Sequence, residues 1–330
     1  MKKKLLNILC CPDCRNTLAL LAIKEANGEV EEGELQCETC KKIYPVLRFI
    51  PRFVPSENYA DNFGFQWNQF RKTQLDSHTG KPIARDRFLT RYGDALLDFS
   101  GRMVLDVGCG AGRNSEVALS MGANLVAVDY SSAVDACWEN LRSFPQLNVV
   151  QADIYHLPFK AASFDSVYCF GVLQHTPDVE KAFKALPAQL KAGAKLFVDV
   201  YPRLLLNIFW PKYWIRPFTK GIPPDRLFPI VQSMVKFLFP ISIALGRIPY
   251  IGRKLRYAIP VLNYEGIFPL TMTQLKEWAL LDTFDMLSPH HDHPQSETTL
   301  RRWFEEEGLK DIKVFRSGFI IGHGTKPESL

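Results

Sequence analysis

Four cysteines near the start of the chain have the spacing of metal ligands. They form two CxxC pairs with 22 residues between them: Cys11 and Cys14, then Cys37 and Cys40. This separation is typical of a zinc ribbon, in which four thiolates complete a tetrahedral shell around one ion. Because a closed shell leaves no position for a substrate, we expect a structural Zn²⁺ ion. The alternative is two redox pairs or buried thiols, and the neighbouring Cys10 is expected to take no part.

A glycine-rich turn is the second feature that could do chemistry. The stretch MVLDVGCGAG, residues 103–112, places three glycines after an apolar run that contains Asp106: Gly108, Gly110 and Gly112. In a parallel sheet, ligands bind beyond the carboxyl ends of the strands, and the turn after the first strand lies there. We therefore expect the backbone of this turn to approach a nucleotide-like ligand.

Two carboxylates end the next two apolar runs. Asp129 closes LVAVD, where it can accept hydrogen bonds from both ribose hydroxyls. Asp153 closes VVQAD, where it can accept from an adenine amino group while the adjacent Ile154 packs on the ring. The pattern does not require a basic residue to hold a pyrophosphate. It therefore favours an adenosyl ligand without phosphates over NAD.

Histidines are the candidates for a general base, because their ordinary pKa lies near neutral pH. One lies in VLQHTP and the others crowd the loop SPHHDHP: His175, then His290, His291 and His293. We take His175, His291 and His293 as candidate catalytic residues. The alternative for His175 is a structural hydrogen bond. The alternatives for the loop are metal binding together with Asp292, contact with an acceptor, or a plain surface position.

Alternating strand-like and helix-like segments must position these residues. The strand-like runs are MVLDVG, ANLVAVD, LNVVQAD, FDSVYCFG and AKLFVDVY, and DIKVFRSGFIIGHGTK is expected to form a closing antiparallel pair. The helix-like stretches are PIARDRFLTRYGDALLDF, RNSEVALSMG, SSAVDACWENLRSF and DVEKAFKALPAQLKAG. Short apolar strands alternating with helices imply a parallel sheet covered on both faces. The predicted fold is a doubly wound α/β sheet, mostly parallel and seven-stranded, with an N-terminal zinc ribbon and a helical insertion before the last strands.

The composition is that of a soluble globular protein. The 330 residues are 47% hydrophobic and 23% charged, which is enough to bury one large core and a smaller one. The start, MKKKLLNILCC, has too few apolar residues for a secretory leader, so we expect a cytoplasmic protein. In that compartment eight cysteines indicate metal binding or packing rather than disulfides.

The ribbon segment resembles a known family. LLNILCCPDCRNTLAL and LQCETCKKIYPVLRFIPRFVP, within about residues 5–55, are similar to the small zinc-ribbon proteins that activate tRNA and protein methyltransferases. The four cysteines match that family. The family usually has a glycine just before the final Ile-Pro, where this chain has Phe49.

Four motifs follow one another within about residues 100–200: VLDVGCGAG, LVAVDYS, VVQADIYHLPF and FDSVYCFGVLQHTPD. In this order they resemble class I S-adenosylmethionine-dependent methyltransferases, in the subgroup that contains quinone-biosynthesis enzymes. The resemblance implies a role for each matching residue: Gly108 and Gly110 beside the methionine and ribose, Asp106 near that part, Asp129 on the ribose, Tyr130 against the adenine, Asp153 with Ile154 on the base, and Phe170 at the floor.

Residues 201–264 carry most of the positive charge. They contain ten Lys or Arg and one acid, Asp225, whereas the whole chain has a net charge of +5. The segment is also strongly apolar, and on a helical projection of residues 230–239 only one narrow face is polar. Four explanations compete: a transmembrane helix, an in-plane helix on an anionic membrane, a helical lid over a hydrophobic acceptor, and RNA binding. The second and third are favoured and are compatible with each other.

These patterns divide the chain into five parts. Residues 56–80 contain four closely spaced aromatic residues and form either a linker that packs on the next domain or a cover over the pocket: Phe63, Phe65, Trp67 and Phe70. The expected parts are a zinc ribbon (1–55), this aromatic segment (56–80), a cofactor-binding α/β domain (81–200), a basic helical insertion (201–264) and the C-terminal part of the α/β domain (265–330).

The predicted function is methyl transfer from S-adenosylmethionine to a hydrophobic small molecule or a lipid-linked acceptor, at oxygen or carbon. Such a transfer needs mainly a desolvated nucleophile aligned with the sulfonium. The alternatives are an RNA methyltransferase in which the ribbon aids RNA binding, and a non-catalytic protein that binds the cofactor. DNA is not expected as a partner. We expect the protein in the cytoplasm, peripheral on the inner face of a membrane.

Overall fold

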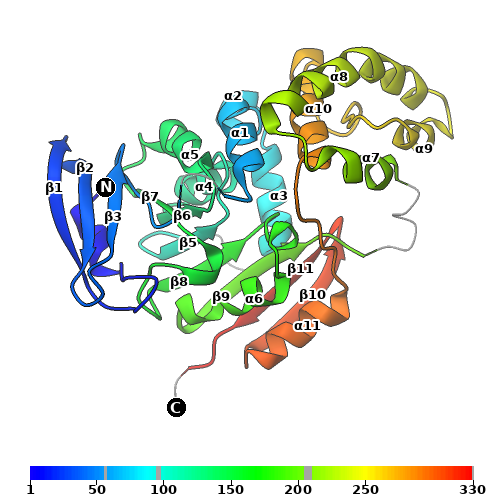
Figure 1. Cartoon of the computed structure of the whole chain (residues 1–330). Helices are drawn as coiled ribbons and strands as arrows, with labels where there is room; N and C mark the ends of the chain where they lie inside the picture. The colour runs from blue at the N-terminus through cyan, green and yellow to red at the C-terminus, as the bar shows by residue number, and fades with distance from the viewer. Residues whose placement is uncertain (56–57, 94–97, 204–209, 329–330) are drawn as a thin grey trace.

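A seven-stranded sheet forms the centre of the molecule (Figure 1). The structure, a computed structural model, describes residues 1–55, 58–93, 98–203 and 210–328. The strand order is β10-β11-β9-β8-β5-β6-β7, in which the last five are parallel and β11 runs antiparallel to both of its neighbours. The strands are β5 (Met103–Val107), β6 (Asn124–Asp129), β7 (Leu147–Gln151), β8 (Phe164–Cys169), β9 (Leu190–Val200), β10 (Lys310–Ser317) and β11 (Phe319–Thr325). The predicted fold class is confirmed.

Helices cover both faces of this sheet, because successive side chains of a buried strand point to opposite sides. Val104 packs with α3, α4 and α5 on one face, and the adjacent Leu105 packs with α6 and α11 on the other. These helices are α3 (Ile83–Tyr92), α4 (Arg113–Ser120), α5 (Ala133–Leu141), α6 (Val179–Lys184) and α11 (Glu297–Glu306). The side chains of Asp178 and Ser296 cap the first turns of α6 and α11. The carboxyl ends of β5 to β9 are therefore left together at one edge.

Two helices are shorter than the sequence predicts. The helix expected over residues 178–193 ends at Lys184, and its last four residues begin β9. Pro187 starts a short 3₁₀ turn between them, because it lacks the N–H that a continuing helix needs. The helix expected over residues 82–99 ends at Tyr92, the next residue Gly93 has φ 68°, and residues 94–97 lie outside the described part of the chain.

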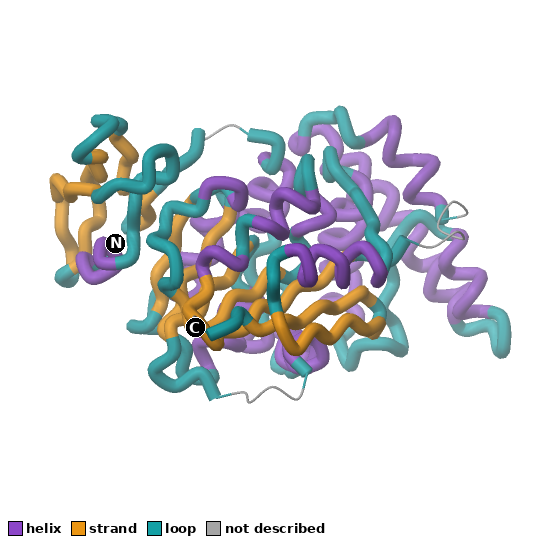
Figure 2. Tube along the Cα trace, turned by 90° about the horizontal axis from the view of Figure 1, so that it is seen from below, coloured by secondary structure: helices purple, strands orange, loops and turns teal. Residues whose placement is uncertain are grey.

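The N-terminal ribbon is a small antiparallel sheet at one end of the molecule (Figure 2). Its strands are β1 (Leu18–Ala26), β2 (Glu29–Cys37), β3 (Ile43–Leu47) and β4 (Ile50–Pro51). It covers the edge strand β7, where Phe53 N donates to Gln151 O at 2.8 Å. Beside this bond, the Arg52 guanidinium donates to Gln151 Oε1 at 2.8 Å and to Asp135 Oδ1 at 2.7 Å. The ribbon thereby pairs an edge that would otherwise expose backbone groups.

The ribbon and the main sheet share one hydrophobic core. Leu9 and Leu35 of the ribbon belong to the same buried cluster as Phe159, which precedes β8. The backbones are joined as well, since Cys10 N donates to Pro158 O at 2.9 Å. Loss of the ribbon would therefore uncover part of the α/β core.

The turn before β4 keeps the backbone conformation that a glycine favours. Phe49 has φ 68°, a left-handed conformation that costs a residue with a side chain about 1–2 kcal/mol. Its ring stacks on Trp138 of α5 with 5.3 Å between ring centroids. Aromatic pairs of this kind contribute about 0.5–1.5 kcal/mol beyond burial, which offsets much of the backbone cost. The departure from glycine therefore adds a contact between the ribbon and the α/β domain.

A helical layer lies at the end of the molecule away from the ribbon (Figures 1 and 2). It contains α7 (Pro211–Thr219), α8 (Pro224–Gly246), α9 (Gly252–Leu255) and α10 (Met272–Leu287). Leu227, Val231 and Val235 of α8 are buried in a core that α10 completes. In the described part of the chain, α8 is the one helix whose length and composition would allow it to cross a membrane.

Two further helices follow the ribbon along the chain and precede α3: α1 (Asp61–Gln69) and α2 (Asp76–Thr79). Helix α1 contacts α5 of the main domain and both α8 and α10 of the helical layer. It therefore connects the helical layer to the edge where the parallel strands end. The domain boundaries that we expect from the sequence stay predictions.

Candidate active site

A cavity of about 490 Å³ opens at the carboxyl ends of β5, β6 and β7 and at the loop after β8. The glycine turn forms part of its wall. Gly108 has φ 82°, and a Cβ there would lie 2.1 Å from Val172; Gly110 has φ 53°, and a Cβ there would lie 3.1 Å from the Trp67 ring. A side chain at Gly108 would therefore displace its neighbours, and the absence of one leaves the backbone facing the cavity.

Asp129 ends β6 beside this turn. Its Oδ2 accepts a hydrogen bond from Gly110 N at 2.9 Å, and its Oδ1 accepts from the N and Oγ of Ser131 at 2.9 and 2.7 Å. Burial raises the pKa of Asp129 in spite of these bonds. Tyr130 and Ile154 line the cavity next to it. A carboxylate between a bare backbone turn and two apolar side chains suits a ribose with an attached adenine.

Phe170, expected at the floor, also lines the cavity, whereas three predicted residues are not among the described lining residues: Asp106, Gly112 and Asp153. Asp106 is buried, its Oδ2 accepts from Ser115 Oγ at 2.6 Å, and burial raises its pKa to about 7. Gly112 packs against α5, and Asp153 caps the turn that follows β7. These three residues support the wall from behind, and their contact with a ligand stays a prediction.

Aromatic residues before and in α1 lie against the cofactor end of the cavity. Tyr59, Phe63 and Trp67 line the cavity, and the Tyr59 ring lies 4.8 Å from the Tyr130 ring. Phe65 lies elsewhere, packed with the core of the helical layer. Rings at these positions exclude water from a site beneath them, as a cover would.

The far side of the cavity is polar, and a chain of hydrogen bonds crosses it. Arg113 Nη1 donates to Gln74 Oε1 at 2.5 Å, and Gln74 Nε2 donates to Asp282 Oδ1 at 3.0 Å. Tyr264 Oη completes the chain by donating to Asp282 Oδ2 at 2.5 Å. Burial, reinforced by the nearby Arg87, lowers the pKa of Arg113 to about 10, and burial raises the pKa of Asp282 to about 6. This series of hydrogen bonds links α4 to α10 and to the segment between α9 and α10.

A buried ion pair lies at the same end. Arg91 Nε donates to Asp199 Oδ2, and Gly171 N donates to Asp199 Oδ1 at 2.5 Å. Arg91 lines the cavity, and its Nη2 has no hydrogen-bond partner among the described residues. Asp199 was not among the predicted site residues, although it lies near the end of a strand-like run as Asp129 does, and that position is the signal that indicates it. Arg91 and Arg113 lie in helices without a motif, so only the fold brings them here.

Of the three candidate catalytic histidines, His175 is the one that lines the cavity in the described part of the chain. Its ring centroid lies 5.2 Å from that of Phe63 and 5.4 Å from that of Tyr201. Its Nδ1 lies 3.0 Å from His291 O, and since a carbonyl oxygen only accepts, Nδ1 must carry the proton. Burial lowers the pKa of His175, so the ring is neutral near pH 7. The lone pair is therefore on Nε2.

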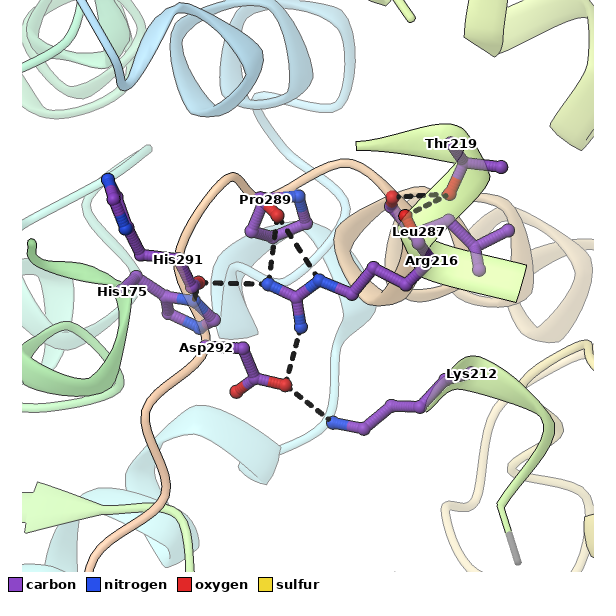
Figure 3. Close-up of polar contacts among 8 residues, drawn as sticks. All are labelled: His175, Lys212, Arg216, Thr219, Leu287, Pro289, His291 and Asp292. Carbon is purple, nitrogen blue, oxygen red and sulfur yellow. Dashed lines mark hydrogen bonds and ion pairs between the residues drawn. The ribbon is translucent and has the colours of Figure 1, made fainter. Parts of the chain in front are cut away.

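Buried charges hold the loop that supports His175 (Figure 3). Arg216 Nη1 donates to Asp292 Oδ2 at 2.5 Å, and Nη2 donates to Pro289 O and His291 O at 2.9 Å each. Lys212 Nζ donates to Asp292 Oδ2 at 3.2 Å. All three charged side chains are less than a tenth exposed. Two of the ten basic residues of the insertion thus serve an internal ion cluster rather than an external partner.

The rings of His291 and His293 are not among the described groups that line the cavity. His291 contributes its carbonyl to His175 and Arg216, while its ring contacts that of Tyr59 at 5.6 Å. His293 is exposed, and its backbone N donates to Gln174 O at 2.8 Å. The loop supports His175 through the His291 carbonyl and is itself held through the Asp292 carboxylate, while a catalytic role for the rings of His291 and His293 stays a prediction.

The four ribbon cysteines converge. The Sγ atoms of Cys11, Cys14, Cys37 and Cys40 all lie within 4.8 Å of one another, and within the described ranges this is the group that could hold a metal ion. Tyr44 Oη lies 3.3 Å from Cys11 Sγ. Four sulfur ligands at such distances are consistent with a tetrahedral zinc site.

Comparison with known proteins identifies two families. Residues 105–198 match a family described as "Methyltransferase domain", and residues 2–47 match one described as "Trm112p-like protein". The first match runs from within β5 to within β9 and includes the glycine turn, and the second includes β1, β2, β3 and the four cysteines of the ribbon.

Two curated relatives are named ubiquinone biosynthesis O-methyltransferase. The one from Coxiella burnetii (strain Dugway 5J108-111) is 35% identical over 137 residues, which is 40% of this chain and 58% of the relative. The one from Xanthomonas oryzae pv. oryzae (strain PXO99A) is 33% identical over 163 residues, which is 47% of this chain and 66% of the relative. The chain therefore spans less than two thirds of these relatives.

Solved structures show more distant similarity. A SAM-dependent methyltransferase from Aquifex aeolicus is 14% identical with a TM-score of 0.43, covering 82% of this chain and 98% of the other. Magnesium protoporphyrin IX methyltransferase from Synechocystis PCC 6803 is 15% identical with a TM-score of 0.42, covering 81% and 96%.

Proposed function

We propose that this chain, in which residues 105–198 belong to the methyltransferase-domain family and residues 2–47 to the Trm112p-like family, is an S-adenosylmethionine-dependent methyltransferase. The observation that carries the proposal is the partly buried Asp129 carboxylate, which accepts a hydrogen bond from Gly110 N beside the positive-φ glycines Gly108 and Gly110. The relatives named as O-methyltransferases support a small-molecule acceptor and transfer to oxygen.

The residues at the cofactor end fit S-adenosylmethionine. Asp129 would accept hydrogen bonds from the ribose hydroxyls, Tyr130 and Ile154 would flank the adenine, and the backbone at Gly108 would approach the methionine portion. Bound there, the cofactor supplies an electrophilic methyl group. The protein contributes orientation and exclusion of water, which account for much of the acceleration in such displacements.

His175 is the proposed general base. Its Nε2 carries a lone pair, lies in a water-poor site between Phe63 and Tyr201, and takes the proton of an acceptor hydroxyl as the oxygen attacks. The His291 carbonyl holds the other ring nitrogen and so keeps Nε2 available. A base at this position favours oxygen over carbon as the methylated atom.

The proposed acceptor is a hydrophobic small molecule or a lipid-linked one. The cavity wall opposite the cofactor end combines aromatic rings, among them Trp210, Tyr213 and Phe319, with charged groups such as Arg91 and Asp282. Such a wall suits an amphipathic molecule with a polar reacting end. The protein then acts in the cytoplasm at the inner face of a membrane, and a structural Zn²⁺ ion occupies the four-cysteine site.

Calorimetric titration with S-adenosylmethionine tests the cofactor site. Asp129→Ala should weaken binding by about 1–3 kcal/mol, the range for losing hydrogen bonds to a charged group, or roughly 5- to 150-fold. Asp98→Ala removes an aspartate at a fully exposed position and is the matched control. Equal affinities of Asp129→Ala and Asp98→Ala would refute the assignment.

Transfer of a labelled methyl group tests the acceptor class. The protein is incubated with the labelled cofactor and either a total lipid extract or total RNA. Label in the lipid fraction is expected, and it should decrease by about a hundredfold or more in His175→Gln if that residue is the base. Label in the RNA fraction instead would replace the proposed acceptor by RNA.

A further inference from the structure

Helix α8 has two apolar stripes, and the fold uses only one of them. The inner stripe is buried against α10, and only five of the 23 residues of α8 are buried in all. The outer stripe consists of Ile230, Phe237 and Ile241, which are 46%, 66% and 48% exposed. Spacings of seven and four residues place these three on one helix face. An apolar groove between Pro229 and Leu238 runs along this side of the helix.

The apolar surface continues past the end of α8. Five large residues between α8 and the end of the following 3₁₀ turn are exposed: Ile248, Tyr250, Ile251, Leu255 and Tyr257. Tyr250 is fully exposed. We define the outer stripe together with these five residues as the α8–α9 surface. It lies at the end of the molecule away from the ribbon (Figure 1). So many large apolar side chains exposed on one helical segment indicate an interaction site.

The charges on the α8–α9 surface are almost all positive. Arg226, Lys236, Arg247 and Lys254 are exposed there, and the one exposed acid among the described residues of α8 and α9 is Asp225. Arg247 also pairs with Glu265. A second copy of the chain would place these cations against their own equivalents, which is repulsive. The charge therefore favours an anionic partner.

Helix α8 cannot leave the protein to cross a bilayer. Its inner stripe, including Val231 and Val235, is completely buried in the core that it shares with α10. Extracting the helix would expose that core, whereas lying on a membrane surface would cover the outer stripe and leave the core intact. The arrangement matches that of in-plane helices, which bury one apolar face and keep cations near the headgroups.

We propose that the α8–α9 surface docks the protein on an anionic bilayer, with Ile230, Phe237, Ile241 and the exposed residues after α8 entering the headgroup region. This docking does not rest on the proposed methyl transfer. Val231 and Val235 face inward and contribute to folding rather than to lipid contact.

Vesicle cosedimentation tests the proposal with the full chain. The wild type should bind phosphatidylcholine vesicles that contain phosphatidylglycerol, and bind pure phosphatidylcholine vesicles more weakly, because an anionic surface attracts the exposed cations of the α8–α9 surface. The triple variant Ile230→Ser, Phe237→Ser, Ile241→Ser keeps every charge. It should partition at least about a hundredfold less, because three large apolar side chains no longer leave water on binding.

A matched control separates the surface from general hydrophobicity. Leu21, Ile23 and Ile43 of the ribbon are 62%, 66% and 53% exposed, and their replacement by serine should leave vesicle binding unchanged. Both triple variants should keep the wild-type circular dichroism spectrum and Tm, which shows that they are folded. Three results would each overturn the proposal. The α8–α9 variant could bind vesicles as well as the wild type does, or the wild type could fail to bind them. The third is that the wild type binds RNA and the α8–α9 variant loses RNA binding rather than vesicle binding.

Discussion

Arg216→Gln tests whether the buried ion cluster holds the loop beneath His175. Arg216 makes four hydrogen bonds across α7 and the loop, to the carboxylate of Asp292 and to the carbonyls of Pro289 and His291. Glutamine retains a polar group but is uncharged and too short to make all four bonds. Asp292 then keeps one cationic partner, Lys212, in a site that is 6% exposed.

The expected cost follows from this burial. Removing one member of a buried pair costs about 3–5 kcal/mol, and the remaining Lys212 places this case at about 3 kcal/mol. For a chain of 330 residues the unfolding entropy is roughly 0.7 kcal/mol per kelvin, so the Tm should decrease by roughly 4 °C. Arg247→Gln is the matched control, because Arg247 is 66% exposed and pairs with Glu265. An exposed pair contributes at most about 1 kcal/mol, or roughly 1 °C.

Calorimetry of the two variants measures this difference, and nitrogen NMR of the His175 ring measures its consequence. In the wild type the proton should be on Nδ1, held by the His291 carbonyl. In Arg216→Gln the loop is released, and the two tautomers should exchange. If Arg216→Gln lowers the Tm no more than Arg247→Gln, the cluster does not hold the loop and the reasoning is wrong.

Two further predictions concern the ribbon and the glycine turn. Cys37→Ser should release the bound zinc, which elemental analysis detects. It should also lower the Tm of the α/β domain, because Leu35 of the ribbon and Phe159 of the α/β domain belong to one core. An unchanged unfolding transition of the α/β domain would show that the ribbon and that domain fold independently. The second prediction concerns Asp106→Asn. As the pH is raised from about 4 to about 7, its free energy of unfolding in urea should increase by roughly 4 kcal/mol relative to that of the wild type. Burial raises the pKa of Asp106 to about 7, so the unfolded chain releases this proton first and the carboxyl's contribution is lost as the pH rises; a pH-independent difference would contradict this.

Local patterns in the sequence were sufficient for the fold. The strand at 103–107 is apolar because it is buried on both faces, and the turn after it needs glycine because a Cβ at Gly108 would overlap Val172. The two CxxC pairs each depend on a tight turn of a few residues. Such signals act over short stretches of chain, so their spacing alone predicted seven strands, a ribbon and Asp129 beside the glycine turn.

The helical insertion shows where local patterns fail. Its basic and apolar residues favoured an in-plane membrane helix or a lid over a hydrophobic acceptor, yet α7 buries Lys212 and Arg216 and exposes Phe218, which is 81% exposed. The reason is Asp292, which lies about 80 residues further along the chain and pairs with both cations. A charge is buried only where a partner offsets its desolvation, and that partner is not visible in the local pattern.

The histidines divide in the same way. The sequence by itself determined that His175 follows β8, at the edge where ligands bind, and that a histidine-rich loop precedes α11. Only the tertiary structure decided that His175 faces the cavity while His291 supplies a carbonyl to its Nδ1. Strand ends and turns are encoded by neighbouring residues, whereas the direction of a side chain and the tautomer of a ring depend on groups that only packing brings within hydrogen-bond distance.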